Sequence, residues 1–392
     1  MIRHLFTLIW NRKRANSLLI VEIFLAFIIL FVVGSVLVYI QRNYRAPLGF
    51  AYEQVWQVSL NSGTQPHSQE FNTFQQILHR LRTMPGVENV ASTGSNTPFT
   101  SGMSNGPLST GPGTSFIMTN FYVGSAELCD VLGLRMRQGR WFDRRDEAAT
   151  RPPVVITEMS RQALFPEESP LGKIIYQGPT EWQVIGVVDH YRGGTVLSEE
   201  APGAFRYNNP QDTSNVATTL LVRVRPGVGA ELEKRMSEAV RTIGPTWTSI
   251  IKPMPELRRT QLKQLLPLPV LLGVICTFLI INVALGLFGV LWLNISRRRG
   301  EIGVRRAMGA TAGNISLQVL GEILVLTTFG LVMGLLVAMQ FPLLGVLSVQ
   351  TSVYLTAMVL AAGLLYLLAT VCALYPSRLA AGIQPAVALR EE

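Results

Sequence analysis

Two groups of residues have side chains that could do acid–base or metal chemistry. Asp189 and His190 follow an apolar run, and a neighbouring carboxylate and imidazole can act as a general acid–base pair. No serine or cysteine stands in a nucleophile elbow, so a turn at the end of a strand is the favoured interpretation. His67 and His79 are too far apart for one face of a helix, and no carboxylate completes them as metal ligands. The residue types therefore predict neither a catalytic site nor a metal site.

Nucleotide chemistry would need a phosphate-binding loop, and the sequence does not contain the pattern GxxxxGK[ST]. The stretch 169–173, Ser-Pro-Leu-Gly-Lys, has one glycine before its lysine and no hydroxyl side chain after it. We therefore expect this chain to bind no cofactor itself. If ATP and Mg²⁺ drive the protein, a partner chain must bind them.

The densest charge lies in the segment 296–310, which holds five arginines and one glutamate. Its second half combines good helix formers with glycines, and this pattern predicts one short helix over 301–310 with a glycine cap. Apolar side chains on this helix could enter a groove of a partner, and its arginines could reach acidic groups there. A solvated basic loop is the alternative, but the ordered apolar residues between the arginines favour a docking helix. The candidate docking residues are Glu301, Ile302, Gly303, Val304, Arg305, Arg306, Met308 and Gly309.

The composition indicates a membrane protein. Of the 392 residues, 48% are hydrophobic and 15% are charged, whereas soluble proteins carry about 25% charge. The net charge of +9 could attract nucleic acid, but the basic residues gather at the ends of apolar runs. Membrane topology explains that placement, so no nucleic-acid partner is expected. Cys129, Cys276 and Cys372 form no CxxC pair, which argues against a zinc site or a disulfide framework.

Four apolar runs are each long enough to cross a hydrocarbon core of roughly 30 Å as helices. They cover 17–40, 268–293, 317–341 and 353–374. The first run is too long for the apolar core of a signal peptide, and no cleavage site follows it, so we expect a retained anchor. Residues 1–14 carry an apolar stripe at helical spacing, which favours an interfacial helix on the inner leaflet over the embedded start of a span.

The basic residues set the orientation of these spans. Residues 1–14 hold four Lys or Arg, the loop 294–316 holds five, and the tail 375–392 holds two. The short connection between the third and fourth spans holds none. Because basic segments stay on the cytoplasmic side, both termini are predicted to be cytoplasmic and residues 41–265 to be extracytoplasmic.

Residues 41–265 have the pattern of a water-soluble α+β domain. A strand–helix–strand pattern occurs twice, at 53–60, 68–84, 87–93, 218–224, 229–243 and 246–251. Two such units separated by an insertion predict a split β-α-β/β-α-β layer that carries an inserted β-rich subdomain at about 96–215. A Ser/Gly/Pro-rich loop is expected at 95–115, and residues 255–266 predict a helical stalk. The fold class is thus an α-helical membrane protein with four transmembrane helices and a large extracytoplasmic α+β domain.

The spans offer few groups for ion transport. Glu22 and Glu322 both lie near the cytoplasmic ends of their spans and no charged side chain lies near the midplane, so neither an ion-coupled carrier nor an aqueous pore is expected. Gly330 and Gly334 form a GxxxG motif in the third span, which permits close contact between helices. We expect this motif to pack within one subunit in preference to forming a dimer seam.

The segment 299–310, Arg-Gly-Glu-Ile-Gly-Val-Arg-Arg-Ala-Met-Gly-Ala, closely resembles the signature of MacB/FtsX-type ABC transporter permeases. The tail 376–390 is similar to the C-terminal ending of that family. Weaker motifs resemble its periplasmic domain and occur in the right order, at Asn120-Phe-Tyr-Val, Gly139-Arg-Trp-Phe, Val154-Val-Ile-Thr, Phe165-Pro, Pro170-Leu-Gly-Lys and Gly186-Val-Val-Asp. The resemblance covers nearly the whole chain.

MacB itself is similar only after an N-terminal ATPase domain that this sequence lacks, so the resemblance implies a separate ABC ATPase subunit. Two copies of it would sit beneath a dimer with a second permease, which is either identical or related. The resemblance also implies mechanotransmission, in which ATP-driven ATPase dimerisation moves the stalks and periplasmic domains and no substrate passes through the spans. The implied location is the bacterial inner membrane, in contact with membrane lipid. A periplasmic adaptor or outer-membrane protein is a further candidate partner.

Efflux of a periplasmic or outer-leaflet substrate is the favoured function, because the large domain looks MacB-like rather than like the small FtsX domain. Two alternatives stay open. One is an FtsX-like transmembrane signal transducer that activates a periplasmic hydrolase or sensor, and the other is lipoprotein extraction or transport. An anchored enzyme is least favoured, because the sequence offers no catalytic constellation.

Overall fold

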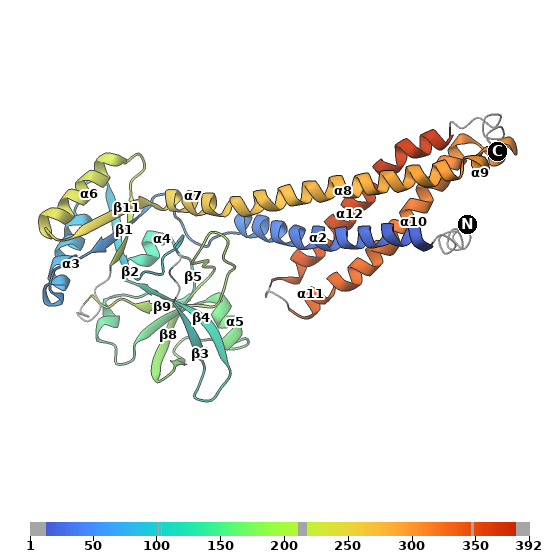
Figure 1. Ribbon diagram of the computed structural model, residues 1–392. Coiled ribbons are helices and arrows are strands. Elements are labelled where there is room, and N and C mark those ends of the chain that lie inside the picture. Colours follow the sequence, from blue (N-terminus) through green and yellow to red (C-terminus); the bar gives the residue numbers. More distant parts are fainter. Residues whose placement is uncertain (1–12, 101, 103, 211–217, 346–348, 382–392) are drawn as a thin grey trace. The chain divides into compact units, whose positions relative to one another are not determined.

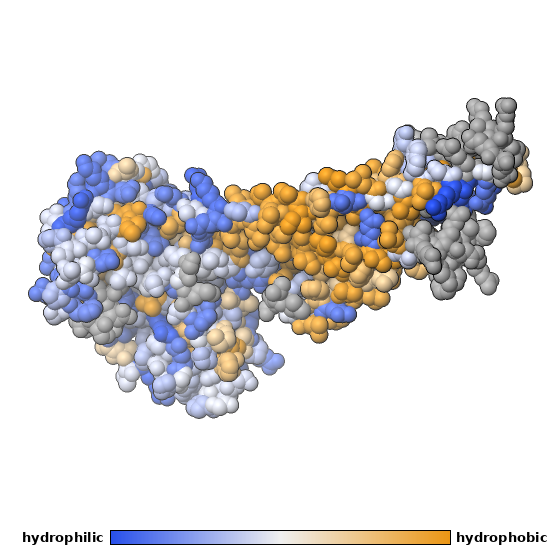
Figure 2. All heavy atoms as spheres, in the orientation of Figure 1, coloured by the Kyte–Doolittle hydropathy of each residue, from blue (hydrophilic) through white to orange (hydrophobic). Residues whose placement is uncertain are grey.

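The computed structural model describes residues 13–100, 102, 104–210, 218–345 and 349–381 (Figure 1). The chain divides into two compact units, which we call the membrane unit (1–42 and 266–392) and the extramembrane unit (43–265). The interfacial helix predicted at 1–14 lies outside the described residues except for its last two. Hydrophobic side chains cover the helices of the membrane unit, whereas hydrophilic side chains predominate over the extramembrane unit (Figure 2).

Within the described residues, four helices are long and apolar enough to cross a membrane. They are α2 (Lys13–Arg45), α8 (Pro267–Arg297), α10 (Ala312–Ala338) and α12 (Thr351–Ala381). Three of the predicted spans lie wholly inside one of these helices. The span predicted at 317–341 runs from α10 into the short helix α11 (Gln340–Leu343).

Helix α2 packs into the membrane unit through one apolar stripe. Leu19, Ile23, Phe27 and Phe31 recur every fourth residue and are at most 1% exposed, so one stripe of the helix faces α10 and α12. The Phe31 ring meets the Phe341 ring edge-on, with 5.4 Å between the centroids. By contrast, α8 buries little of its apolar surface within the unit, which is compatible with a lipid environment.

The extramembrane unit contains two strand–helix–strand segments, one near its beginning and one near its end. They comprise β1 (Val55–Asn61), α3 (His67–Arg82), β2 (Val87–Thr93), β10 (Thr219–Val224), α6 (Ala230–Ile243) and β11 (Thr248–Pro253). Each element lies within two residues of the bounds that the sequence predicts. The strands are ordered β11-β1-β10-β2 and every neighbouring pair is antiparallel. A strand from the end of the unit therefore lies between two strands from its beginning.

Alternating side chains give this sheet two buried faces. Val222 and Leu220 point toward α3 and α6, where they meet residues such as Ile77 and Met236. Leu221, between them on the same strand, faces the opposite side and joins a second apolar cluster. Because successive side chains of a strand point to opposite faces, this continuous apolar run is what a strand covered on both faces requires.

The insertion adds further strands to the same sheet. It comprises β3 (Asn105–Ser109), β4 (Phe116–Gly124), α4 (Leu128–Leu132), β5 (Met136–Gly139), the 3₁₀ helix η1 (Arg144–Ala148), β6 (Pro153–Thr157), α5 (Glu158–Leu164), β7 (Ile174–Gln177), β8 (Thr180–Val188) and β9 (Gly203–Tyr207). The link between the two parts is the pairing of β2 with β4 at Thr93 and Gly124. The insertion has its own apolar cluster, which includes Ile156, Ile175 and Val187.

The prediction of a loop at 95–115 is wrong in its second half, because β3 lies inside it. Leu108 of β3 is 1% exposed and is paired with Ile117 of β4. The Ser/Gly/Pro composition of this segment is typical of a loop. The segment is extended because it pairs with the long strand β4. Intrinsic preference for strands is weak, so pairing with a neighbour decides such cases.

A carboxylate is buried at the start of α5. Glu158 is 3% exposed, and its carboxylate accepts hydrogen bonds from Arg161 Nη2 at 2.8 Å and Gln162 Nε2 at 3.0 Å. Arg137 Nε lies 3.4 Å from the same group. The hydrogen bonds from Arg161 lower the pKa of Glu158 despite the opposing effect of burial. The charged carboxylate therefore stabilises the folded insertion.

Glu158→Gln is expected to destabilise the insertion at neutral pH by about 1–3 kcal/mol, because Arg161 loses its charged partner. A carboxyl whose pKa is lowered by folding stabilises the fold above its ordinary pKa, and this contribution is lost as the pH falls through the folded-state value. The difference between wild type and variant should therefore be largest near pH 7 and should shrink below about pH 4. Hydrogen exchange of β6 and β9 at several pH values measures it. A difference that grows in acid would contradict this account.

Candidate functional site

The basic segment forms a short helix between α8 and α10. Helix α9 spans Arg299–Ala307, so it begins two residues before the predicted start. It ends at Ala307; Gly309, two residues further on, has a φ of +96°, and the Ala310 amide donates to the Arg305 carbonyl at 3.0 Å. This is the hydrogen bond of a glycine-terminated helix end, in which a left-handed residue lets the chain turn back. Gly309 therefore terminates α9, and Thr311 caps the start of α10 by accepting from the Asn314 amide.

A closed ring of polar side chains holds α9 in place. Arg298 Nη1 donates to Glu322 Oε2 at 2.9 Å, and Arg298 Nε donates to Glu301 Oε2 at 3.1 Å. Arg305 Nη2 donates to Glu301 Oε1 at 2.7 Å, and Arg305 Nη1 donates to Gln318 Oε1 at 2.8 Å. Gln318 Nε2 completes the ring by donating to Glu322 Oε1 at 3.1 Å. We call these five residues the α9 ring.

The α9 ring joins three elements through partly buried charges. Arg298 ends α8 and its side chain is 11% exposed, while the Glu322 side chain on α10 is 22% exposed. Burial alone would lower the pKa of Arg298, but the charge and hydrogen bonds of Glu322 and Glu301 raise it. Charge-assisted hydrogen bonds of this kind are about twice as strong as neutral ones. Helix α9 is thus bound to the ends of α8 and α10 and does not hang as a free loop.

The structure places the candidate docking residues in three different environments. Ile302 is 8% exposed and packs in the core of the membrane unit, so little of its side chain is open to a partner. Gly303 is also buried. Val304 and Met308 are 43% and 76% exposed and lie one turn apart, so both are accessible. The arginine expected to reach a partner, Arg305, instead pairs within its own chain.

One of the predicted docking residues has a side chain that the structure does not describe. The side chain of Arg306 is outside the described residues. Conversely, three members of the α9 ring are not among the docking residues predicted from the sequence: Arg298, Gln318 and Glu322. A signal was present, because Gln318 and Glu322 are four residues apart on one helix beside a basic segment, a spacing at which side chains meet.

The GxxxG motif forms the contact between α10 and α2. A Cβ built on Gly334 would lie 2.4 Å from Phe27 Cδ1, and one on Gly330 would lie 2.8 Å from Ile23 Cγ2. Real Cβ atoms do not approach so closely, so only glycine permits this spacing of the two helices. In this structure the motif faces a helix of its own chain.

The acid–base candidates of the extramembrane unit are engaged in local contacts. Asp189 Oδ1 accepts from Arg137 Nη1 at 3.2 Å, and His190 Nδ1 lies 3.1 Å from Glu200 Oε2. His67 contacts Glu70 at 2.8 Å at the beginning of α3. Over the residues that the structure describes, no group of three His, Cys, Asp or Glu side chains could hold a metal ion. These contacts match the interpretation of Asp189 and His190 as a turn after β8.

Comparison with protein families accounts for both units. Residues 18–239 match the model of the MacB-like periplasmic core domain, which is more than half of the chain. Residues 273–385 match the model of the FtsX-like permease C-terminal domain. The second match includes all five residues of the α9 ring and the GxxxG motif.

Individual relatives agree with this assignment. The chain is 31% identical over 222 residues to the macrolide export ATP-binding/permease protein MacB 1/2 of Paracoccus denitrificans, covering 55% of this chain and 33% of that protein. It is 30% identical over 229 residues to MacB of Aggregatibacter actinomycetemcomitans, covering 57% and 35%. The chain thus spans about a third of the length of these curated relatives. The periplasmic region of MacB from Actinobacillus actinomycetemcomitans aligns at 20% identity with a TM-score of 0.39, covering 53% of this chain and 92% of that one.

The two family models cover four apolar helices, a β-containing periplasmic-type domain and the α9 segment. The chain belongs to the MacB/FtsX-type ABC transporter permeases.

Proposed function

We propose that this chain is a permease subunit that converts ATP hydrolysis by a separate ABC ATPase into a conformational change of the extramembrane unit. The observation that carries the proposal is the α9 ring, which fixes a short exposed helix to the ends of two membrane helices. A force applied to α9 by a partner would move α8 and α10 with it. A flexible loop in the same place would change its own conformation and would not move the two helices.

An ABC ATPase is the proposed partner because the chain matches the model of the FtsX-like permease C-terminal domain, and permeases of this family work with an ATPase. ATP and Mg²⁺ would be bound by two ATPase copies beneath a dimer of permeases, each copy docking on one α9. The docking contact would be mainly apolar and would involve Val304 and Met308, because these side chains are exposed whereas Glu301 and Arg305 are paired within the chain.

Met308→Glu is expected to reduce co-purification of the ATPase at least tenfold, because a charge would enter an apolar contact. Quantitative pull-down from membranes that contain both subunits measures this loss. Ser296→Glu is the matched control, because it adds the same charge at an exposed position of the same segment without removing an apolar side chain. Undiminished binding in Met308→Glu would disprove docking through this face.

Orientation is part of the proposal, with both termini in the cytoplasm and the extramembrane unit in the periplasm. The support is the distribution of Lys and Arg, which are concentrated in the segments that would then be cytoplasmic. A cysteine at Thr114, an exposed residue of the 101–115 segment, should react with an impermeant maleimide in intact spheroplasts. Labelling confined to lysed cells would reverse the topology.

Efflux of a periplasmic or outer-leaflet substrate is the transport direction we propose, since the curated relatives are named macrolide export proteins. Identification of the proteins that co-purify with the chain separates this function from its competitors. A periplasmic adaptor or an outer-membrane protein would support efflux. A peptidoglycan hydrolase or a sensor kinase would point to signalling, and an outer-membrane lipoprotein would point to lipoprotein transport.

A further inference from the structure

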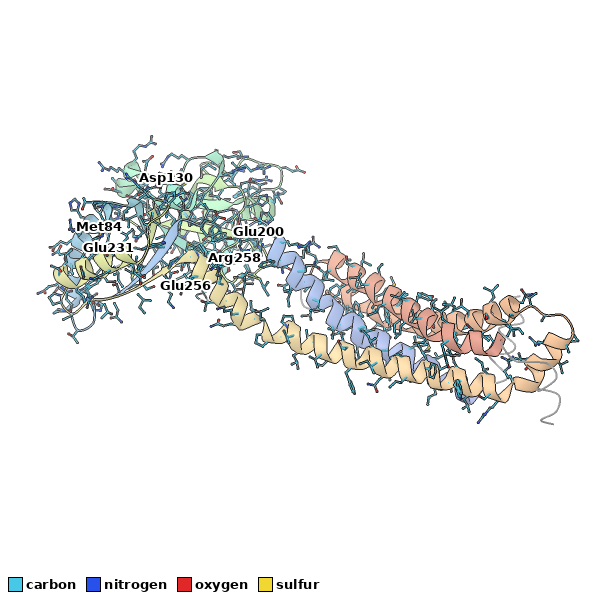
Figure 3. All side chains as sticks on the ribbon, turned by 90° about the horizontal axis from the view of Figure 1, so that it is seen from above. Met84, Asp130, Glu200, Glu231, Glu256 and Arg258 are labelled. Atoms are coloured by element: carbon cyan, nitrogen blue, oxygen red, sulfur yellow. The ribbon has the colours of Figure 1, made fainter. Side chains whose placement is uncertain are left out.

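Two segments of the extramembrane unit adjoin the membrane unit along the chain. One is the segment 43–52, which contains the last residues of α2, and the other is helix α7 (Met254–Leu265), which precedes α8. The loop 189–202 between β8 and β9 contacts both segments, and we call it the junction loop. Figure 3 labels Glu200 on this loop and Arg258 on α7.

Arg192 is the central side chain of the junction loop. It is 6% exposed, and its guanidinium donates to the carbonyl of Asn43 at 3.0 Å and to that of Ala46 at 2.9 Å. The same guanidinium donates to the carbonyl of Ser198 at 2.8 Å and 3.1 Å. The Arg192 amide also donates to the Leu48 carbonyl at 2.9 Å. The buried side chain therefore binds Asn43 and Ala46 to the junction loop, and the backbone amide of the same residue adds Leu48.

The chemistry of this contact is that of a helix C-terminal cap supplied from elsewhere in the fold. The last carbonyls of a helix have no partner within the helix, and the helix end carries partial negative charge. Asn43 lies in the last turn of α2, so a cation on its carbonyl is favourable. A guanidinium suits the position because it presents five donors in a rigid fork, whereas an ammonium would reach fewer carbonyls.

The other side of the junction loop is attached to α7. The Val196 amide donates to Gln261 Oε1 on α7 at 3.0 Å. Arg258 of the same helix hydrogen-bonds to the Tyr52 hydroxyl and lies over the ring of Tyr44, 5.4 Å from its centroid. The segment 43–52 and α7 are thus joined both through the junction loop and directly.

Gly49 shows how tightly the junction loop is seated. Its φ is +80°, and a Cβ built there would lie 2.0 Å from the carbonyl oxygen of His190. A side chain at this position would force the loop away from the segment 43–52. The contact is therefore a fitted interface and not a chance approach of two loops.

We infer that Arg192 is a positioning residue that holds the last turn of α2 and the stalk helix α7 in one rigid body with strands β8 and β9. A displacement of either segment would then move these strands with it. The functional consequence rests on the proposed transmission of force, whereas the lock itself is a property of this chain alone. Its test therefore needs no ATPase, and failure of ATPase docking would leave it standing.

The test is a distance measurement by pulsed EPR on the full chain in lipid nanodiscs. Cys129, Cys276 and Cys372 are first replaced by serine, and spin labels are placed at the exposed positions Arg45 and Gln264. The otherwise unsubstituted protein should give one narrow distance distribution. Arg192→Gln should at least double its width, because the carbonyls of Asn43 and Ala46 lose their guanidinium donor.

Arg137→Gln is the matched control, because the ion pairs of Arg137, with Asp189 of the same loop and Glu158 of α5, join it neither to the segment 43–52 nor to α7. Its distribution should stay narrow. Protected amides in β10 show whether each variant is folded. An unchanged width in folded Arg192→Gln overturns the inference. If Arg192→Gln does not fold, Gln261→Leu decides, since it detaches only the Val196 amide: a widened distribution supports the lock and an unchanged one overturns it.

Discussion

Replacing Gly334 by leucine is expected to prevent correct assembly of the membrane unit. The Cβ alone would lie 2.4 Å from Phe27 Cδ1 and 3.0 Å from Phe27 Cγ. The Phe27 side chain is fully buried and stacks with Phe31, so it has no space into which to move. Adding methylenes to a packed core costs about 1–3 kcal/mol, and leucine adds a branched side chain, so we expect a cost at or above the top of that range.

The expected result is a loss of the monodisperse peak when detergent extracts are analysed by size-exclusion chromatography. Gly334→Ala should be extracted as folded protein with a melting temperature lower by about 2–8 °C, because one methyl group costs less than a leucine side chain. Gly321→Leu on the same helix is the matched control, since a Cβ there has no heavy atom within 4 Å. Equal behaviour of Gly334→Leu and Gly321→Leu would show that α10 does not pack on α2 through this motif.

The elements that the sequence predicts well are those whose pattern is local. The apolar runs of the spans and of β10 are visible without knowledge of any neighbour, and the observed strand bounds differ from the predicted ones by at most two residues in the strand–helix–strand segments. Helix α9 was also predictable, because its termination by Gly309 depends only on local backbone geometry. Local chemistry is therefore sufficient for helices, caps and the paired strand–helix–strand segments.

Features that depend on a distant neighbour could not be predicted in the same way. The strand β3 exists because β4 pairs with it, although its composition is that of a loop. Whether the Ile302 side chain faces the core of its own chain depends on where α8 and α10 hold α9. The apolar pattern alone does not distinguish a core contact from a partner contact. Arg192 lies about 150 residues along the chain from Asn43, and no spacing rule joins them.

The α9 ring explains why a single carboxylate in α10 should matter for coupling. Glu322 accepts from both Arg298 and Gln318, so it joins the end of α8 to the side of α10 on which Arg305 is anchored. Glu322→Ala removes two of the ring's contacts and leaves the largely buried Arg298 with Glu301 alone. Truncating one partner of a buried, hydrogen-bonded charge pair costs about 2–5 kcal/mol; because Glu322 is 22% exposed, we expect the lower end.

A loss of about 2 kcal/mol shifts an equilibrium between fixed and loosened α9 by roughly 30-fold. In the complex with its ATPase, Glu322→Ala should therefore lower the permease-dependent stimulation of ATP hydrolysis at least tenfold, while the ATPase still co-purifies through Val304 and Met308. The double variant Arg298→Glu with Glu322→Arg restores opposite charges at these two positions and should recover part of the stimulation.

Glu238→Ala is the control, because its pair with Lys234 is exposed and spans 4.0 Å, where an ion pair contributes about 0–1 kcal/mol. Full stimulation in Glu322→Ala would mean that α9 transmits force without the ring, and loss of ATPase binding in the same variant would mean that the ring shapes the docking face itself.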